Sequence, residues 1–176
     1  MPFNLIKTYP DLLELIHLSE RDGKISLRKI FDRDVTDNHT FMFREKQIRP
    51  TKIDGKVDLG RVFNHLITEE IDVEEDGDIF KKRVFERDRA QRLHWLKPHV
   101  DEVIPDTIEV FSVEERKARK NVITTYIYNV TQKYVVVLEP QRSGTDYYLL
   151  TAYYLNKKYG VKQMNKKLKK RLPELS

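Results

Sequence analysis

The sequence predicts an α+β protein in which a helical segment packs on a twisted antiparallel sheet, preceded by a small, mostly helical N-terminal region. Helical spacing of apolar residues characterises the first part of the chain, and three strand patterns follow one another in the last third. Helices first and an antiparallel sheet afterwards are typical of the α+β class. The 176 residues, 39% of them hydrophobic, suffice for one ordinary domain or for a compact domain with a smaller helper.

The N-terminal region should consist mainly of short helices and turns. Gly23 and Gly55 each follow an aspartate, a strong turn signal, and Phe41 and Phe43 alternate with polar neighbours as in a strand. In chain order we expect a helix over 11–18, a turn at 21–24, a helix around 27–31, a strand at 41–43, a turn at 54–55 and a helix over 59–67.

The C-terminal region should contain a long helix and then the sheet. Pro98 disfavours helix at the preceding residue, so the long helix should end or kink between His94 and Lys97. A nearly continuous valine run at 134–138 indicates a strand buried on both faces. In chain order we expect a helix over 79–96, a strand at 107–111, a helix over 113–120, strands at 123–129, 134–138 and 147–155, and a lysine-rich helix over 162–172.

Charge divides the chain into an acidic and a basic part. Residues 1–79 carry 12 Lys/Arg and 17 Asp/Glu, a net charge of −5. Residues 80–176 carry 21 Lys/Arg and 11 Asp/Glu, a net charge of +10. We therefore divide the chain into an acidic region of unassigned role, 1–78, and a basic domain, 79–176. The asymmetry favours polyanion binding by the basic domain. The alternative is a solvated acidic loop followed by an ordinary basic surface.

Several classes of protein are disfavoured by composition. Cysteine is absent, which excludes disulfides, thiol catalysis and cysteine-ligated zinc. His17, His39 and His65 lack a ligand partner at convincing spacing, and the carboxylates of the basic domain are scattered, so we expect neither a metal nor another cofactor. No apolar run approaches the roughly 18 residues of a membrane span. The first ten residues lack secretory-signal character, so we expect cytoplasmic action, in the host or in a target cell, with secretion or injection left open.

The expected long helix brings together groups suited to RNA cleavage. Cleavage without a metal needs a base, an acid and cations at the phosphate. At 100° per residue, Arg83, Arg87, Ala90 and His94 fall on one stripe, which Lys97 would extend. The alternative is a solvent-exposed arginine face with His94 at the helix C-terminus.

The last strand offers hydroxyl groups. Alternation puts Tyr147, Leu149, Thr151 and Tyr153 on one face, so Thr151 and Tyr153 are neighbours that can contact a phosphate or a base. Arg142, in the preceding loop, can add a phosphate contact. The alternative is that these are simply good strand residues. The C-terminal lysines favour a nucleic-acid backbone and indicate no reaction.

Three segments together resemble a known superfamily. They are RDRAQRLHWLKPHV (87–100), YVVVLE (134–139) and YYLLTAYYL (147–155), and their order resembles the barnase–EndoU–colicin–RelE superfamily of ribonucleases, in the branch found in phage proteins and polymorphic toxins. The resemblance covers about residues 80–160. It implies RNA lying across the face of the sheet and metal-independent cleavage that leaves a 2′,3′-cyclic phosphate.

The resemblance also implies roles for individual residues. His94 would be the leading acid or base, with His99 as a rival for the second proton transfer. Thr151 and Tyr153 match a Thr-x-Tyr signature that positions the phosphate. The expected catalytic residues are His94, Thr151, Tyr153, Lys97 and Arg87, and the expected substrate-binding residues are Arg83, Arg92, His99, Arg142 and Tyr147. Which residue is the base and which the acid stays open.

The resemblance implies RNA as the main partner, with transfer RNA favoured by class, and an acidic inhibitor such as an antitoxin or immunity protein. Two alternatives remain: a non-catalytic nucleic-acid-binding module, and a protein-interaction module of phage or toxin–antitoxin origin. The acidic region could cover the basic face or bind a partner.

Overall fold

The computed structural model describes residues 2–50, 52–53, 56–141 and 143–173. It is an α+β fold with a six-stranded sheet and two two-stranded sheets, which confirms the predicted class. The elements in chain order are η1 (Pro2–Ile6), α1 (Glu20–Phe31), η2 (Asp32–Thr36), β1 (Met42–Phe43), β2 (Lys46–Pro50), β3 (Lys52–Ile53), β4 (Lys56–Val57), α2 (Leu59–Ile67), β5 (Thr68–Glu75), β6 (Asp78–Phe85), α3 (Arg87–Ala90), η3 (Leu93–Trp95), α4 (Leu96–Val100), β7 (Ile108–Lys117), β8 (Lys120–Asn129), β9 (Tyr134–Pro140), β10 (Asp146–Tyr154) and α5 (Lys158–Lys169).

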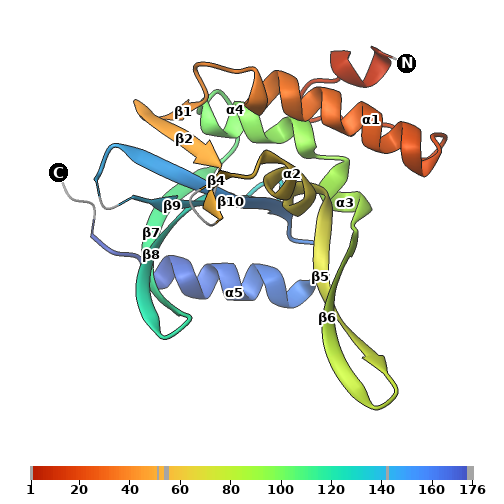
Figure 1. The fold of residues 1–176 in the computed structure, drawn as a ribbon. Helices are drawn as coiled ribbons and strands as arrows, with labels where there is room; N and C mark the ends of the chain where they lie inside the picture. The colour runs from red at the N-terminus through yellow and green to blue at the C-terminus, as the bar shows by residue number, and fades with distance from the viewer. Residues whose placement is uncertain (1, 51, 54–55, 142, 174–176) are drawn as a thin grey trace.

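The large sheet has the strand order β1-β2-β10-β9-β8-β7. Strands β7 to β10 form an antiparallel meander. Strand β2, however, pairs with β10 in parallel. The sheet is therefore mixed, whereas the sequence predicts an antiparallel one. This parallel pair joins the first third of the chain to its last strand (Figure 1).

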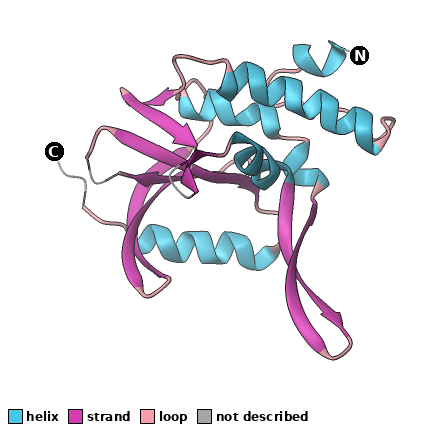
Figure 2. Cartoon of the chain, in the orientation of Figure 1, coloured by secondary structure: helices cyan, strands magenta, loops and turns pink. Residues whose placement is uncertain are grey.

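Helices cover both faces of this sheet. Helices α1, α2 and α4 lie on one face, called here the closed face, and α5 lies on the other, the α5 face (Figures 1 and 2). Strand β9 shows why both faces need cover, because Val136 and Leu138 belong to the core of the closed face while Val135 and Val137 belong to the core under α5. The expected strand buried on both faces is therefore confirmed.

Residues from both parts of the chain share the core of the closed face. Leu27, Ile30 and Phe31 of α1 lie in the same hydrophobic cluster as Trp95 and Leu96. The division proposed at 78/79 falls at the first residues of β6. Apolar burial, which stabilises by about 25 cal/mol per Å², thus ties the acidic region to the basic one.

The helix expected over 79–96 is wrong. Residues 78–85 form β6, which pairs antiparallel with β5, and only short helical turns follow. The acidic run is one strand of this hairpin, and its partner strand supplies the opposite charges, as in the register pairs of Glu70 with Arg83 and Asp72 with Lys81. The turn uses Asp76 and Gly77, with φ of 52° and 82°. Aspartate followed by glycine is a preferred sequence for such a two-residue turn.

The helix expected over 113–120 is also wrong. Strand β7 continues to Lys117 and pairs with β8 along its whole length. Phe111 and Val113 alternate with polar residues and lie opposite Tyr126 and Thr124, so burial beside a long partner strand decides the conformation.

Two expectations near the N-terminus are wrong for a local reason. Residues 11–18 form no helix, because the side chain of Asn4 bonds both the backbone N–H and the carbonyl of Glu14. Ser19 accepts a hydrogen bond from the N–H of Asp22 and caps α1. The expected turn at 21–24 therefore lies inside the first turns of that helix.

Other elements match their predictions. Helix α2 has the expected bounds, and β8, β9 and β10 contain most of the three expected strands. Strand β1 lies within 41–43, and α5 begins four residues earlier than expected. The turn expected at 54–55 lies outside the described residues. None of the helices in the described ranges is both long and apolar enough to cross a membrane.

Candidate functional site

The two histidines expected to transfer protons are buried in the closed face. His94 is 4% exposed and His99 is 1% exposed. Burial lowers the pKa of each to about 4, so both rings are neutral near pH 7. Neither ring nitrogen of His94 has a hydrogen-bond partner among the described residues. The backbone of Asp11 raises the pKa of His94, but this effect is smaller than that of burial. Neither ring can reach an RNA at the surface.

His99 belongs to a buried polar cluster. Its Nδ1 lies 2.7 Å from the carbonyl of Trp95, and its Nε2 lies 3.0 Å from the amide nitrogen of Asn129. The same amide nitrogen donates to the hydroxyl of Tyr9 at 3.0 Å, and that hydroxyl donates to the carboxylate of Asp106. These bonds join the N-terminal segment to the sheet, which gives His99 a structural role.

The predicted cations of this segment do not converge on one site. The ammonium of Lys97 pairs with Asp101 at 2.5 Å. The guanidinium of Arg92 lies 3.7 Å from the centroid of the Tyr154 ring, and its side chain is only 11% exposed. Arg87 is exposed on α3. The stripe expected on one continuous helix is therefore wrong, since a strand and several short helices replace that helix.

A register shift decides which residues of β10 share a face. The shift lies between Leu149 and Thr151. Thr151 and Tyr153 do share a face, the α5 face, as predicted. Tyr147 and Leu149 instead pack with the core of the closed face, so placing all four on one face is wrong. Arg142 lies outside the described residues.

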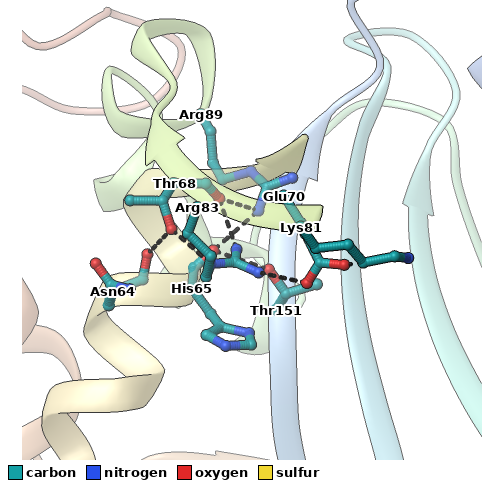
Figure 3. A network of polar contacts seen from close by, with 8 residues as sticks. All are labelled: Asn64, His65, Thr68, Glu70, Lys81, Arg83, Arg89 and Thr151. Atoms are coloured by element: carbon teal, nitrogen blue, oxygen red, sulfur yellow. Dashed lines mark hydrogen bonds and ion pairs between the residues drawn. The ribbon is translucent and has the colours of Figure 1, made fainter. Parts of the chain in front are cut away.

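A polar network joins Thr151 to the β5–β6 hairpin (Figure 3). The hydroxyl of Thr151 donates to the carbonyl of His65 at 3.2 Å, and Arg89 donates to the same carbonyl at 2.9 Å. Arg83 donates to the hydroxyl of Thr68 at 2.8 Å and to its carbonyl at 2.9 Å. The network fixes the C-terminus of α2, the base of the hairpin, α3 and β10 relative to one another.

The imidazole of His65 points away from these bonds (Figure 3). Burial lowers its pKa, and the nearby Arg83, Arg61 and Arg89 lower it further. Its backbone carbonyl, and not its ring, takes part in the network, and the side chain is partly exposed. Nothing in the sequence distinguishes it from His17 or His39.

Next to this network lies a cleft of about 190 Å³, called here the α5 cleft. It separates the base of β5–β6 and α3 from α5. Arg89 lines it, with the guanidinium carbon 5.4 Å from the centroid of the Tyr153 ring. The cleft is lined by Glu69, Glu86, Arg89, Tyr153, Tyr154, Leu155, Asn156, Lys157, Tyr159, Gly160, Gln163, Met164 and Lys167.

Arg89 and Tyr153 provide a cation and a proton donor in this cleft. The Nε of Arg89 is buried and has no hydrogen-bond partner among the described residues. Burial lowers the pKa of Arg89, but an arginine side chain remains charged in proteins. Burial raises the pKa of Tyr153, so its hydroxyl stays protonated and can donate a hydrogen bond.

Lysines and carboxylates line the rest of the cleft. Lys167 of α5 lies 2.6 Å from Glu115, whose side chain is 17% exposed, and Lys157 lies 3.9 Å from Glu69. The carboxylate of Glu86 is occupied, because it accepts hydrogen bonds from two backbone N–H groups at the start of α3. Glu69, at the rim and partly exposed, is therefore the carboxylate better placed to act as a base.

The sequence pointed to Tyr153 but missed Arg89, Glu69, Lys157 and Lys167. Arg89 lies within the segment that carries the resemblance, but a helical projection gives it no special place. In the residues that the structure describes, no group of three or more His, Cys, Asp or Glu side chains could hold a metal ion. Comparisons with protein-family models, with curated proteins and with solved structures found no match.

Proposed function

We propose that the protein is a metal-independent endoribonuclease and that the α5 cleft is its active site. The main support is Arg89, a half-buried cation whose Nε has no hydrogen-bond partner among the described residues, held against Tyr153 in a cleft that two lysines line. Cations fixed in a partly desolvated site stabilise the charge that develops on a phosphate during cleavage. The resemblance of residues 80–160 to ribonucleases of the barnase–EndoU–colicin–RelE superfamily supports the same function.

In the proposed reaction, Glu69 takes the proton of a ribose 2′-hydroxyl. The 2′-oxygen attacks the adjacent phosphorus, and a 2′,3′-cyclic phosphate forms as the bond to the 5′-oxygen breaks. Tyr153 donates its proton to that leaving oxygen. Arg89 and Lys167 stabilise the added negative charge on the phosphate oxygens.

The test is cleavage of a labelled RNA in EDTA by the full chain. Tyr153→Phe should lower the rate about 100-fold, because loss of one acid–base group costs 10²–10⁴-fold. Glu69→Gln should cause a similar loss, and end analysis should find 2′,3′-cyclic phosphate. Affinity for RNA should change little in both variants.

Two matched variants serve as controls. Tyr148→Phe removes a hydroxyl from the same strand outside the cleft, and His94→Leu removes the leading histidine of the sequence prediction. Both should retain the wild-type rate. No cleavage in EDTA by the wild type, or equal rates in wild type and Tyr153→Phe, would refute the proposal.

A second candidate is RNA binding without cleavage. It is favoured by the exposed lysines along and after α5, which are Lys158, Lys162, Lys166, Lys169 and Lys170. In that case affinity should fall linearly with salt on a log–log scale, and the cleft variants should change nothing. Transfer RNA as substrate and an acidic inhibitor as partner remain predictions from the resemblance.

A further inference from the structure

The β5–β6 hairpin, called here the acidic hairpin, stands away from the body of the protein (Figure 1). Its two strands form a separate two-stranded sheet. Ile79 is 73% exposed and Phe80 is 40% exposed, and Phe80 lies opposite Val73 on the face that also carries Ile71. A two-stranded ribbon is marginally stable alone in water. Its exposed apolar residues therefore favour a covering partner.

The acidic hairpin also carries unbalanced charge. Residues 68–85 contain seven carboxylates and three basic side chains, a net charge of −4. At the tip, residues 74–78 contain four carboxylates and no basic residue. Among the described residues, the ion pairs of this hairpin lie nearer its base, at Glu69 and Glu70. The carboxylates at the tip therefore form no ion pair with any described residue.

A second hairpin, β7–β8, carries the opposite charge at its tip. Residues 116–120 read Arg-Lys-Ala-Arg-Lys, all of them exposed. Both hairpins project past α5 in the same direction, and α5 lies between them (Figure 1). The ion pair at the basic tip joins Lys117 to Glu115 of the same hairpin, and no ion pair between described residues joins the two tips. The molecule thus presents two surfaces of complementary charge that lie apart within one copy.

We propose that the protein forms a two-fold symmetric dimer in which the acidic hairpin of each copy packs against the basic hairpin tip and α5 of the other. A two-fold axis makes both contacts at once, because the same two surfaces meet twice. Eight residue pairs at about 3.3 Å each give a ribbon roughly 26 Å long. Two such contacts bury on the order of 1,000 Å², the size of a weak specific dimer. This proposal is independent of the proposed cleavage.

The test is the mass of the full chain in solution, measured by sedimentation at low and high salt. The wild type should be dimeric at low salt and dissociate at high salt, because salt screens exposed charges beyond about 10 Å at 0.1 M. Glu74→Lys/Glu75→Lys and Arg116→Glu/Arg119→Glu should each be monomeric. Each double substitution leaves its hairpin tip with no net charge. An equimolar mixture of the two variants should therefore recover part of the association as a heterodimer, through the contact that joins its two unaltered tips.

Controls show whether the dimer depends on these two hairpins in particular. Glu20→Lys/Asp22→Lys changes the same charge on α1, away from both hairpins, and should leave the dimer intact. Phe80→Ser should weaken the dimer at every salt concentration. A monomeric wild type, or no recovery in the mixture, would overturn the proposal. So would loss of RNA affinity without change of mass in Arg116→Glu/Arg119→Glu, which would make the basic tip a nucleic-acid surface.

Discussion

The two faces of the six-stranded sheet have different chemistry although they share the same strands. The closed face, under α1, α2 and α4, buries His94 and His99 as neutral rings among apolar and aromatic side chains. The α5 face places Arg89, Tyr153 and Lys167 beside a cleft, and burial raises the pKa of Tyr153 so that its hydroxyl stays protonated. Whether a polar side chain is enclosed or lies beside a cleft therefore depends on the helices that cover the face on which it lies.

The largest expected difference between the faces is in the dependence of stability on pH. His94 and His99 have a pKa of about 4 in the folded state, against 6.5 for an exposed histidine. Between these values the unfolded chain binds more protons, so lowering the pH favours unfolding. Each ring should cost roughly 3 kcal/mol of stability as the pH falls through this window. Urea unfolding at a series of pH values measures this loss.

His94→Leu should make the free energy of unfolding less dependent on pH. Near pH 7 it should leave that free energy unchanged or raise it, because it removes a buried polar group that makes no hydrogen bond to the described residues. His17→Leu, at an exposed position, is the control and should follow the wild-type curve. Parallel curves for His94→Leu and the wild type would show that this ring is not held neutral by the closed face.

A smaller effect is expected for the charged cluster of the α5 face. Lys167 contacts Glu115 at 2.6 Å and the hydroxyl of Tyr126 at 2.9 Å. Lys167→Met should destabilise by about 1–2 kcal/mol, because it leaves the largely enclosed carboxylate of Glu115 short of a donor. Lys167→Met/Glu115→Gln should recover part of this loss in a double-mutant cycle. The exposed neighbour Lys166→Met should change stability by less than about 0.5 kcal/mol, and an equal loss there would contradict the assignment.

The smallest expected effect concerns Thr151. Its hydroxyl bonds the carbonyl of His65, which holds the end of α2 against β10. Thr151→Val should cost about 1 kcal/mol of unfolding free energy, and Thr151→Ser should cost less, because serine can keep the bond. If Thr151→Val instead abolished cleavage at unchanged stability, Thr151 would contact the substrate, as the sequence resemblance implied.

Periodicity predicted the elements whose burial is set by neighbouring residues. Helix α2 and the Val-rich strand β9 are examples, since each shows its buried positions in a local pattern. It failed for the first part of 79–96 and for 113–120, where charged residues at helical spacing form strands instead. In both cases the deciding contact is a partner strand in a long hairpin, and strand preference depends on that partner.

The sequence by itself determined the α+β class, the buried valine strand and the shared face of Thr151 and Tyr153, because these follow from alternation within single elements. Only the tertiary structure decided that His94 is enclosed and that Arg89 meets Tyr153. Burial of a side chain depends on which distant segments pack over it. Here α1 and α2 seal one face of the sheet, while α5 leaves a cleft on the other.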